Sequence, residues 1–234
     1  MEQLGAGSRA ALLGKVTRSV SRTPRLARMR LCSSFIVLAL ILLATACGGS
    51  NSGGSNLTLD TGPAPWPNPD NVADRIDAAG LPSSSTESLT VHCHSHVDIF
   101  VNGKSEPIAS SIGREDQSLF SPLHTHATSG LIHIEAPEDQ HFTVGMLFTE
   151  WGVRLTNDCI GGYCSPDTKL TAYLDGTSYT QPISTITLEK GEEIAIVIGS
   201  PPATIPSSWD CLANIDPTIE NPAQCADFGQ QVPA

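Results

Sequence analysis

The sequence predicts a mainly β domain: an antiparallel, sandwich-like sheet with two short helices and an irregular C-terminal tail pinned by a disulfide. Three observations predict this fold class. Apolar and polar residues alternate along residues 89–101, as in a strand with two unlike faces. The dipeptides Asn-Gly at 102–103 and Asp-Gly at 175–176 are typical of tight β-hairpin turns. Residues 193–199 form a nearly continuous apolar run, which favours a central strand.

The first expected strand, residues 89–101, divides its side chains between two faces. Apolar side chains occupy one face, and histidines with one aspartate occupy the other. The apolar set is Leu89, Val91, Cys93, Val97, Ile99 and Val101, and the polar set is His92, His94, His96 and Asp98. The histidines of this strand therefore point away from its apolar residues.

Two short helices should interrupt the strands. Residues 71–79 carry apolar side chains at helical spacing, and Gly80 with Pro82 should end that helix. A second helix is expected between Thr143, which can cap its start, and Gly152, which should end it. Its aromatic side chains recur with the apolar helical period, so we interpret them as core residues.

The remaining strands lie in the C-terminal half. Residues 171–174 should form a hairpin strand before the turn at 175–176. The turn at 188–191 leads into the apolar run at 193–199, which we expect at the centre of the sheet. The tail from residue 201 to 234 is rich in proline and polar residues, and we expect it to be irregular.

Residues 1–46 are predicted to be an export signal. Seven Lys or Arg and one acid precede an apolar run at 35–46, which is shorter than the ~20 residues of a membrane span. The run ends in Leu-Ala-Thr-Ala-Cys, which resembles the lipobox of bacterial lipoproteins. That resemblance implies that Cys47 is lipidated and becomes the mature N-terminus; an ordinary secretory signal is the alternative. Met29 is an alternative start site, which would leave residues 1–28 out of the protein.

Composition divides the exported chain into two parts. Residues 47–68 are expected to be a lipid-anchored tether, and residues 69–234 a single β-rich domain with a histidine cluster. Beyond residue 46 the chain has six Lys or Arg and 23 Asp or Glu, a net charge of −17. So acidic a surface argues against nucleic acid as a partner. We expect the protein on the outer face of a bacterial membrane, held there by the lipid on Cys47.

Five cysteines remain beyond the lipidation candidate, and an oxidising compartment favours their pairing. The simplest scheme pairs Cys159 with Cys164, and Cys211 with Cys225. That scheme leaves Cys93 over, and a pairing of Cys93 with a tail cysteine stays open. Half of a zinc clip at Cys159 and Cys164 is an alternative, but the chain has no second thiol pair of matching spacing.

All seven histidines fall between residues 92 and 141, and six of them gather into three tight groups. Residues two apart in a strand lie on one face, ~6–7 Å from each other. Imidazole is the commonest protein ligand of zinc and copper. The three groups are His92, His94 and His96; His124 and His126; and His133 with Glu135.

Residues 122–137 are expected to form a hairpin in which His124 lies directly opposite His133. Opposed residues have Cβ atoms ~4.5–5.5 Å apart. His124, His126 and His133 would then share one face, with Glu135 farther along it, and present three imidazoles to one metal ion. A slip of one residue in the register would break this geometry.

The row of His92, His94 and His96 would complete that site, or build a second one, if its strand lies beside the hairpin. One ion cannot bind all three, because the outer two lie ~13 Å apart in a regular strand. His94 with one neighbour is the favoured ligand set. Asp98 would orient a ligand imidazole, and the isolated His141 is expected at the surface.

The histidine-rich pattern suits copper and zinc alike. A blue-copper centre is disfavoured, because strand alternation turns Cys93 away from the neighbouring histidines and Met146 lies outside any Cys-x-His order. A cupin is disfavoured too, because Glu135 comes nine residues after His126 and another histidine intervenes.

Residues 94–113, 123–137 and 142–153 resemble a group of uncharacterised exported bacterial and archaeal proteins. The shared order is His-x-His, Asn-Gly-Lys, His-Thr-His…Gly…His and Trp-Gly. The resemblance covers about the middle half of the chain, and it implies no particular mechanism.

These observations favour an extracytoplasmic, membrane-anchored module that captures or hands over copper or zinc. A metal-dependent hydrolase or oxidase could use the same histidines, with Glu135 or Glu150 as general base. Two hypotheses without a metal are a structural or interaction domain with incidental histidines, and a proton-sensing face of close imidazoles. The chain has no nucleophile elbow, phosphate-binding glycine loop or dinucleotide fingerprint. The sequence identifies no protein partner.

Overall fold

The structure is a computed structural model that describes residues 57–87, 90–215 and 225 of the chain. The expected export signal, Cys47 and the first part of the expected tether lie outside the described residues. No helix in the described part is long and apolar enough to cross a membrane.

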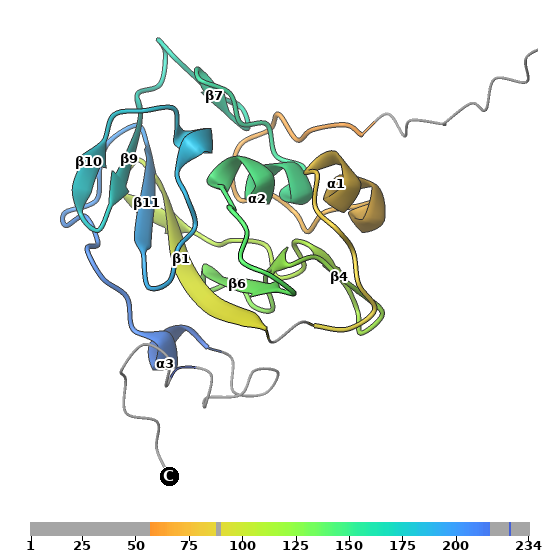
Figure 1. The fold of residues 1–234 in the computed structure, drawn as a ribbon. Helices are drawn as coiled ribbons and strands as arrows, with labels where there is room; N and C mark the ends of the chain where they lie inside the picture. Colours follow the sequence, from red (N-terminus) through yellow and green to blue (C-terminus); the bar gives the residue numbers. More distant parts are fainter. Residues whose placement is uncertain (1–56, 88–89, 216–224, 226–234) are drawn as a thin grey trace, which may run out of the picture. The chain divides into compact units, whose positions relative to one another are not determined.

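One sheet forms the centre of the domain (Figure 1). Its strands are β1 (Val91–Val101), β2 (Lys104–Glu106), β5 (Leu123–His124), β6 (Leu131–Ala136), β9 (Leu170–Leu174), β10 (Thr177–Tyr179) and β11 (Glu193–Ile198). The order is β10-β9-β11-β1-β6-β5, with β2 paired to β1. Neighbouring strands are antiparallel except β1 and β11, which are parallel. The predicted mainly β fold is confirmed, and the parallel pair is an addition that the sequence did not indicate.

Short elements surround this sheet. Two small antiparallel pairs are β3 (Arg114–Glu115) with β4 (Leu119–Phe120), and β7 (Cys159–Ile160) with β8 (Tyr163–Cys164). The helices are α1 (Val72–Ala78), α2 (Val144–Trp151), α3 (Cys211–Asn214) and the 3-10 turn η1 (Ile183–Thr185). The sequence predicted α1 and α2. It did not predict α3, because four residues are too few to show a helical period.

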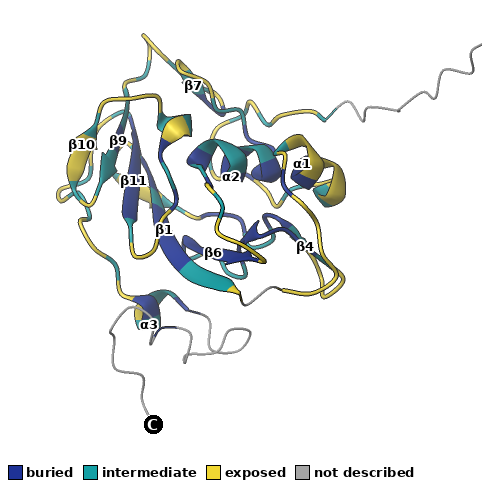
Figure 2. Cartoon of the chain, viewed as in Figure 1, coloured by how far each residue is buried: buried dark blue, intermediate teal, exposed yellow. Residues whose placement is uncertain are grey.

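Helix α2 covers one face of the sheet and forms the core there. The hydroxyl of Thr143 accepts a hydrogen bond from the Met146 amide, and Gly152 ends the helix at φ 78°, as the sequence predicted. Leu147 and Phe148 of the helix are buried in the same cluster as Ile132 on β6. Figure 2 shows β6 and β11 buried along their whole length.

On the opposite face of the sheet, the residues of β1 are apolar near the end of the strand and polar toward its start. Near the end of β1, Phe100 packs with Ala195 and Val197 of β11 in a small apolar cluster. Toward the start of the same strand, this face carries the buried His94 and His96. The alternation predicted for β1 is therefore confirmed, and on this face it buries histidines toward the start of the strand and Phe100 near its end.

Both predicted hairpin turns form. Asn102 and Gly103 have φ values of 49° and 81°, and Asp175 and Gly176 have φ values of 48° and 74°. Positive φ at both central residues is the requirement of the two-residue turn that asparagine or aspartate followed by glycine satisfies. The strand β11, expected at the centre of the sheet, lies between β9 and β1.

Residues 57–68, which composition placed in the tether, pack on the domain. Trp66 is only 4% exposed, and its ring meets that of Trp151 edge to face at 5.4 Å. The indole of Trp151 donates a hydrogen bond of 2.8 Å to the carbonyl of Pro67. Asp60 forms a β-bridge with Val153. The packed domain therefore begins before residue 69, because one buried tryptophan outweighs the proline-rich composition around it.

Both predicted disulfides are present. Cys159 and Cys164 are directly opposed partners on β7 and β8. Cys211, at the start of α3, pairs with Cys225, and both are buried. Neither bridge includes Cys93, which lies on the α2 side of β1 as strand alternation predicted.

Candidate metal centre

Strands β1, β6 and β5 place the histidines on one face of the sheet. His133 on β6 lies opposite His94 on β1 and also opposite His124 on β5. His92 lies opposite Glu135 in the same ladder. Opposed residues point to the same side of a sheet, so these side chains meet. The predicted register of His124 with His133 is confirmed, and β1 does lie beside the hairpin.

The hairpin is shorter than expected. Strand β5 ends at His124, because the next residue turns to different partners. The backbone amide of Thr125 donates a hydrogen bond to the carbonyl of Ile112. The side-chain hydroxyl of Thr125 donates one of 2.7 Å to the carbonyl of Ala109. His126 therefore reaches the histidine cluster from an irregular segment and not from a strand.

A first set of possible ligands is His124, His126 and His133, whose nearest ring nitrogens lie within 4.8 Å of one another. The Nε2 atoms of His124 and His126 are 3.1 Å apart. The ring centroids of His126 and His133 are 4.4 Å apart. His124 and His133 are fully buried. The three imidazoles that the sequence expected to share an ion are thus brought together.

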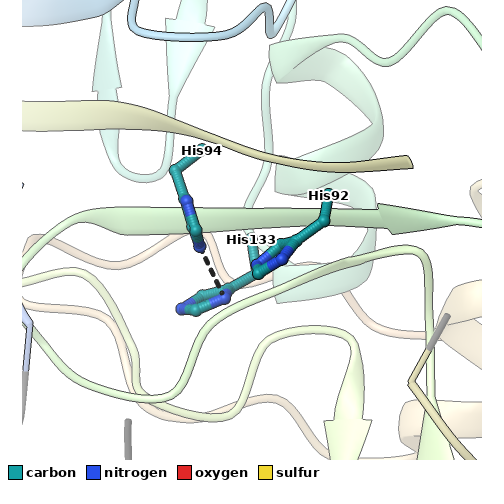
Figure 3. Close-up of side chains that lie close together, drawn as sticks. All are labelled: His92, His94 and His133. Carbon is teal, nitrogen blue, oxygen red and sulfur yellow. Dashed lines mark hydrogen bonds between the residues drawn. The ribbon is translucent and has the colours of Figure 1, made fainter. Parts of the chain in front are cut away.

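A second set, His92, His94 and His133, also meets within 4.8 Å. Figure 3 shows His92 and His94 reaching from β1 toward the ring of His133 on β6. Nε2 of His94 is 3.1 Å from Nδ1 of His133. His133 is therefore a member of both sets.

Two carboxylates lie at the edges of these imidazoles. Oε1 of Glu135 is 3.4 Å from Nδ1 of His133 and 3.4 Å from Nε2 of His92. Oε1 of Glu87 is 3.5 Å from Nε2 of His126 and 3.9 Å from Nε2 of His124. Sequence reasoning missed Glu87, because it precedes the strands and has no spacing relation to any histidine. Together with His124 and Glu135 it forms a further possible metal-binding group.

Hydrogen bonds to the outer nitrogens orient two of the rings. Nδ1 of His124 donates to the carbonyl of Ser121 at 2.9 Å, which leaves the lone pair on Nε2 directed into the cluster. An Arg114 guanidinium N–H lies 3.0 Å from Nδ1 of His126. Arginine only donates, so this nitrogen of His126 is the acceptor and its Nε2 carries the proton. A metal at Nε2 of His126 would have to displace that proton.

Three imidazoles of the cluster, those of His94, His124 and His126, are held neutral. Burial, with the neighbouring His133, lowers the pKa of His94 to about 2 and that of His126 to about 3. Burial lowers the pKa of His124 well below its usual value. Neutral imidazole is the form that binds metals. The same shifts argue against proton sensing by these three residues, because none of them would change charge near neutral pH.

Burial also raises the pKa of Glu87, a carboxyl group at the edge of the cluster. The nearby charge of Glu135 raises this pKa further. A metal ion beside these carboxylates would favour their charged forms.

His96 does not join the neighbouring histidines; it belongs to a separate possible metal-binding group with Asp98 and Glu193. Its Nδ1 is 2.9 Å from Oε2 of Glu193, and its Nε2 donates to the carbonyl of Ser129 at 3.0 Å. The indole of Trp209 stacks on its ring. Burial lowers the pKa of His96, but the Glu193 carboxylate, Asp98 and the Ser129 carbonyl together raise it by more, so the net shift is upward. His96 and Glu193 therefore form a closely coupled buried pair between β1 and β11, in which burial also raises the pKa of Glu193.

The sequence also assigned roles to Asp98, His141 and Glu150. Asp98 groups with His96 and Glu193, close enough for the three to hold an ion, and His96 is the one histidine with which it shares a possible metal-binding group of the described residues. His141 is exposed, as predicted. Glu150, an expected general base, lies on α2 and belongs to none of the possible metal-binding groups of the described residues.

The buried carboxyl of Glu150 should make the protein less stable as pH rises. It is 1% exposed and has no well-aligned hydrogen bond among the described residues. Burial raises its pKa from 4.5 to about 8, although the Ser121 hydroxyl opposes the shift. The native state thus keeps a proton that the unfolded chain releases above pH 4.5. The free energy of unfolding should fall through this window, by on the order of 4 kcal/mol.

Urea unfolding of the wild type and Glu150→Gln at pH 5 and pH 9 measures this effect. The variant should lose much less stability than the wild type between the two values. Equal losses in both proteins would show that Glu150 does not hold the proton.

A pocket of about 310 Å³ opens onto the acidic edge of the cluster. Glu87 and Glu135 line it, together with the small or apolar side chains of Ser84, Phe120 and Pro122. It offers a solute or an ion a route to the carboxylates that touch the histidines.

Comparison of the chain with protein-family models, curated proteins and solved structures finds no match.

Proposed function

We propose that this protein is an exported, membrane-anchored lipoprotein that binds copper or zinc and captures the ion or hands it over. The ion would be held by His124, His126 and His133. One observation carries the proposal: three ring nitrogens within 4.8 Å of one another, on two fully buried rings and one half-buried ring. Burying several imidazoles against one another is costly, and a shared cation offsets that cost.

The donor set favours a transition metal. Neutral imidazoles suit zinc and copper, whereas magnesium and calcium prefer oxygen ligands. The net charge of −17 beyond residue 46 attracts cations in general. The pocket lined by Glu87 and Glu135 reaches the two carboxylates that lie beside the histidines.

Export and anchoring are supported by two independent features. Two disulfides, Cys159–Cys164 and Cys211–Cys225, suit an oxidising compartment. The apolar run before Cys47 resembles a lipoprotein signal, and lipid on this cysteine would hold the domain at the membrane.

A metal-dependent hydrolase or oxidase is the second candidate, and the pocket favours it. Three histidines leave a fourth coordination position for water or substrate. Glu135 and Glu87 line the pocket beside that position and could act as general base, whereas Glu150 belongs to no group with the histidines among the described residues. An exchangeable water on the bound ion, seen by X-ray absorption, would favour catalysis over transport.

Metal analysis tests the main proposal. Protein purified without a histidine tag is incubated with copper or zinc, desalted and measured by inductively coupled plasma mass spectrometry. The wild type should retain metal, and His124→Ala with His126→Ala in one chain should retain less. His141→Ala is the matched control, because His141 is exposed and outside the cluster. A wild type that stays metal-free with both metals would refute the proposal.

A further inference from the structure

We infer that the histidine face holds two metal ions that share His133, one beside β1 and one beside β5. This inference rests on the proposed metal binding and adds a second ion to it. The first ion would use His124 and His126, and the second would use His92 and His94.

The position of His133 in the sheet carries the inference. Strand β6 lies between β1 and β5, and His133 is the ladder partner of His94 on one side and of His124 on the opposite side. Neighbouring strands are ~4.8 Å apart, so the backbones of His94 and His124 are separated by ~9–10 Å. The two histidine pairs therefore approach His133 from opposite sides.

Distances exclude one ion for all five rings. Two nitrogens bound to one ion at ~2.0–2.1 Å can be at most ~4.2 Å apart. Among the described residues, no group of ligand atoms within 4.8 Å combines His92 or His94 with His124 or His126. Each pair does form such a group with His133. Two centres with one common member match these groups, and a single centre for all five rings does not.

Imidazole has the chemistry for a shared ligand. Its two ring nitrogens can each bind one ion once the remaining N–H proton has left. Oε1 of Glu135, 3.4 Å from Nδ1 of His133, can accept that proton and pass it to solvent through the pocket that Glu135 lines. No redox change is needed: at His133 two nitrogen–metal bonds form, one N–H bond breaks, and one proton is released. Binding of the first ion at Nε2 of His126 displaces the proton of that nitrogen as well.

The surrounding charges suit two ions. Two divalent cations bring four positive charges. The imidazolate of His133 and the carboxylates of Glu135 and Glu87 place three negative charges against them. The His96 group lies apart from this arrangement, since both ring nitrogens of His96 already have partners.

Copper loading of single-site variants tests the inference. The wild type and the His141→Ala control should bind two Cu(II) per chain, and their spin intensity in electron paramagnetic resonance should fall below the copper content because an imidazolate couples the two ions. His94→Ala and His124→Ala should each bind one copper with full spin intensity. Where an alanine variant lacks a native circular dichroism spectrum, His94→Gln or His124→Gln takes its place.

The outcomes separate this inference from the proposed function. One copper per chain in the wild type, lost in both His94→Ala and His124→Ala, would overturn the pair of ions and keep the metal-binding proposal. Two coppers with full spin intensity would overturn the sharing of His133. No bound copper or zinc at all would overturn the proposed function itself.

Discussion

Bound copper or zinc should raise the free energy of unfolding by about 4 kcal/mol when the free metal is 1,000 times its Kd. The reason is linkage: the ion binds the native cluster, and the unfolded chain does not hold the histidines of β1, β5 and β6 together. His133→Ala should remove most of this gain, because His133 belongs to both histidine sets. Thermal unfolding with metal and with a chelator measures the effect.

The His141→Ala variant is the control for that experiment. It should keep the metal-induced rise in melting temperature, because His141 is exposed and contributes to no possible metal-binding group of the described residues. An equal rise in His133→Ala and in the wild type would place the metal elsewhere in the protein.

Glu193→Ala should lower the free energy of unfolding by about 3–5 kcal/mol, the usual cost of removing one partner from a buried ion pair. Oε2 of Glu193 is 2.9 Å from Nδ1 of His96, and the two side chains are 1% and 5% exposed. The two residues are also register partners in the parallel β1–β11 pair. Without the carboxylate, the imidazole would stay buried with no counter-charge from Glu193.

A double-mutant cycle sharpens this prediction. His96→Ala combined with Glu193→Ala should cost clearly less than the sum of the single changes, because the second change removes the group that the first left unpaired. Lys104→Ala, which breaks an exposed pair with Glu106, should change stability little. Additive costs for His96 and Glu193 in urea unfolding would contradict a coupled buried pair.

The two kinds of histidine in this sheet serve different purposes. His96 has a carboxylate, a carbonyl and an indole as partners, so its environment is complete without an ion. His94, His124 and His133 lie against neighbouring imidazoles, and burial keeps His94 and His124 neutral. Only the second kind brings three imidazoles together for one metal ion.

Local pattern was sufficient for several features of the site. The alternation in 89–101 determined which face of β1 carries histidines, since successive side chains of a strand must point to opposite sides. The i, i+2 spacing and a short connection were enough to place His124 opposite His133. The turn dipeptides and the cysteine spacing likewise predicted both hairpins and both disulfides.

Contacts between segments that are distant in the sequence could not be predicted from local sequence patterns. Glu87 reaches His126 from a segment without periodicity, and Arg114 reaches the same ring from a two-residue strand. Trp66 joined the core although its neighbours are prolines. His96 has the same spacing as His94, yet Glu193 on the neighbouring strand β11 gives it a different role.

By itself, then, the sequence determined that this is a β-rich protein with histidines gathered on strand faces, because strand geometry and turn chemistry are local properties of the chain. Only the tertiary structure decided that β1 lies beside β6, that His133 meets two histidine pairs, and that His96 is removed from them. Strand order and the positions of the loops depend on how all the apolar residues of the core are buried together. No short stretch of residues determines this burial by itself.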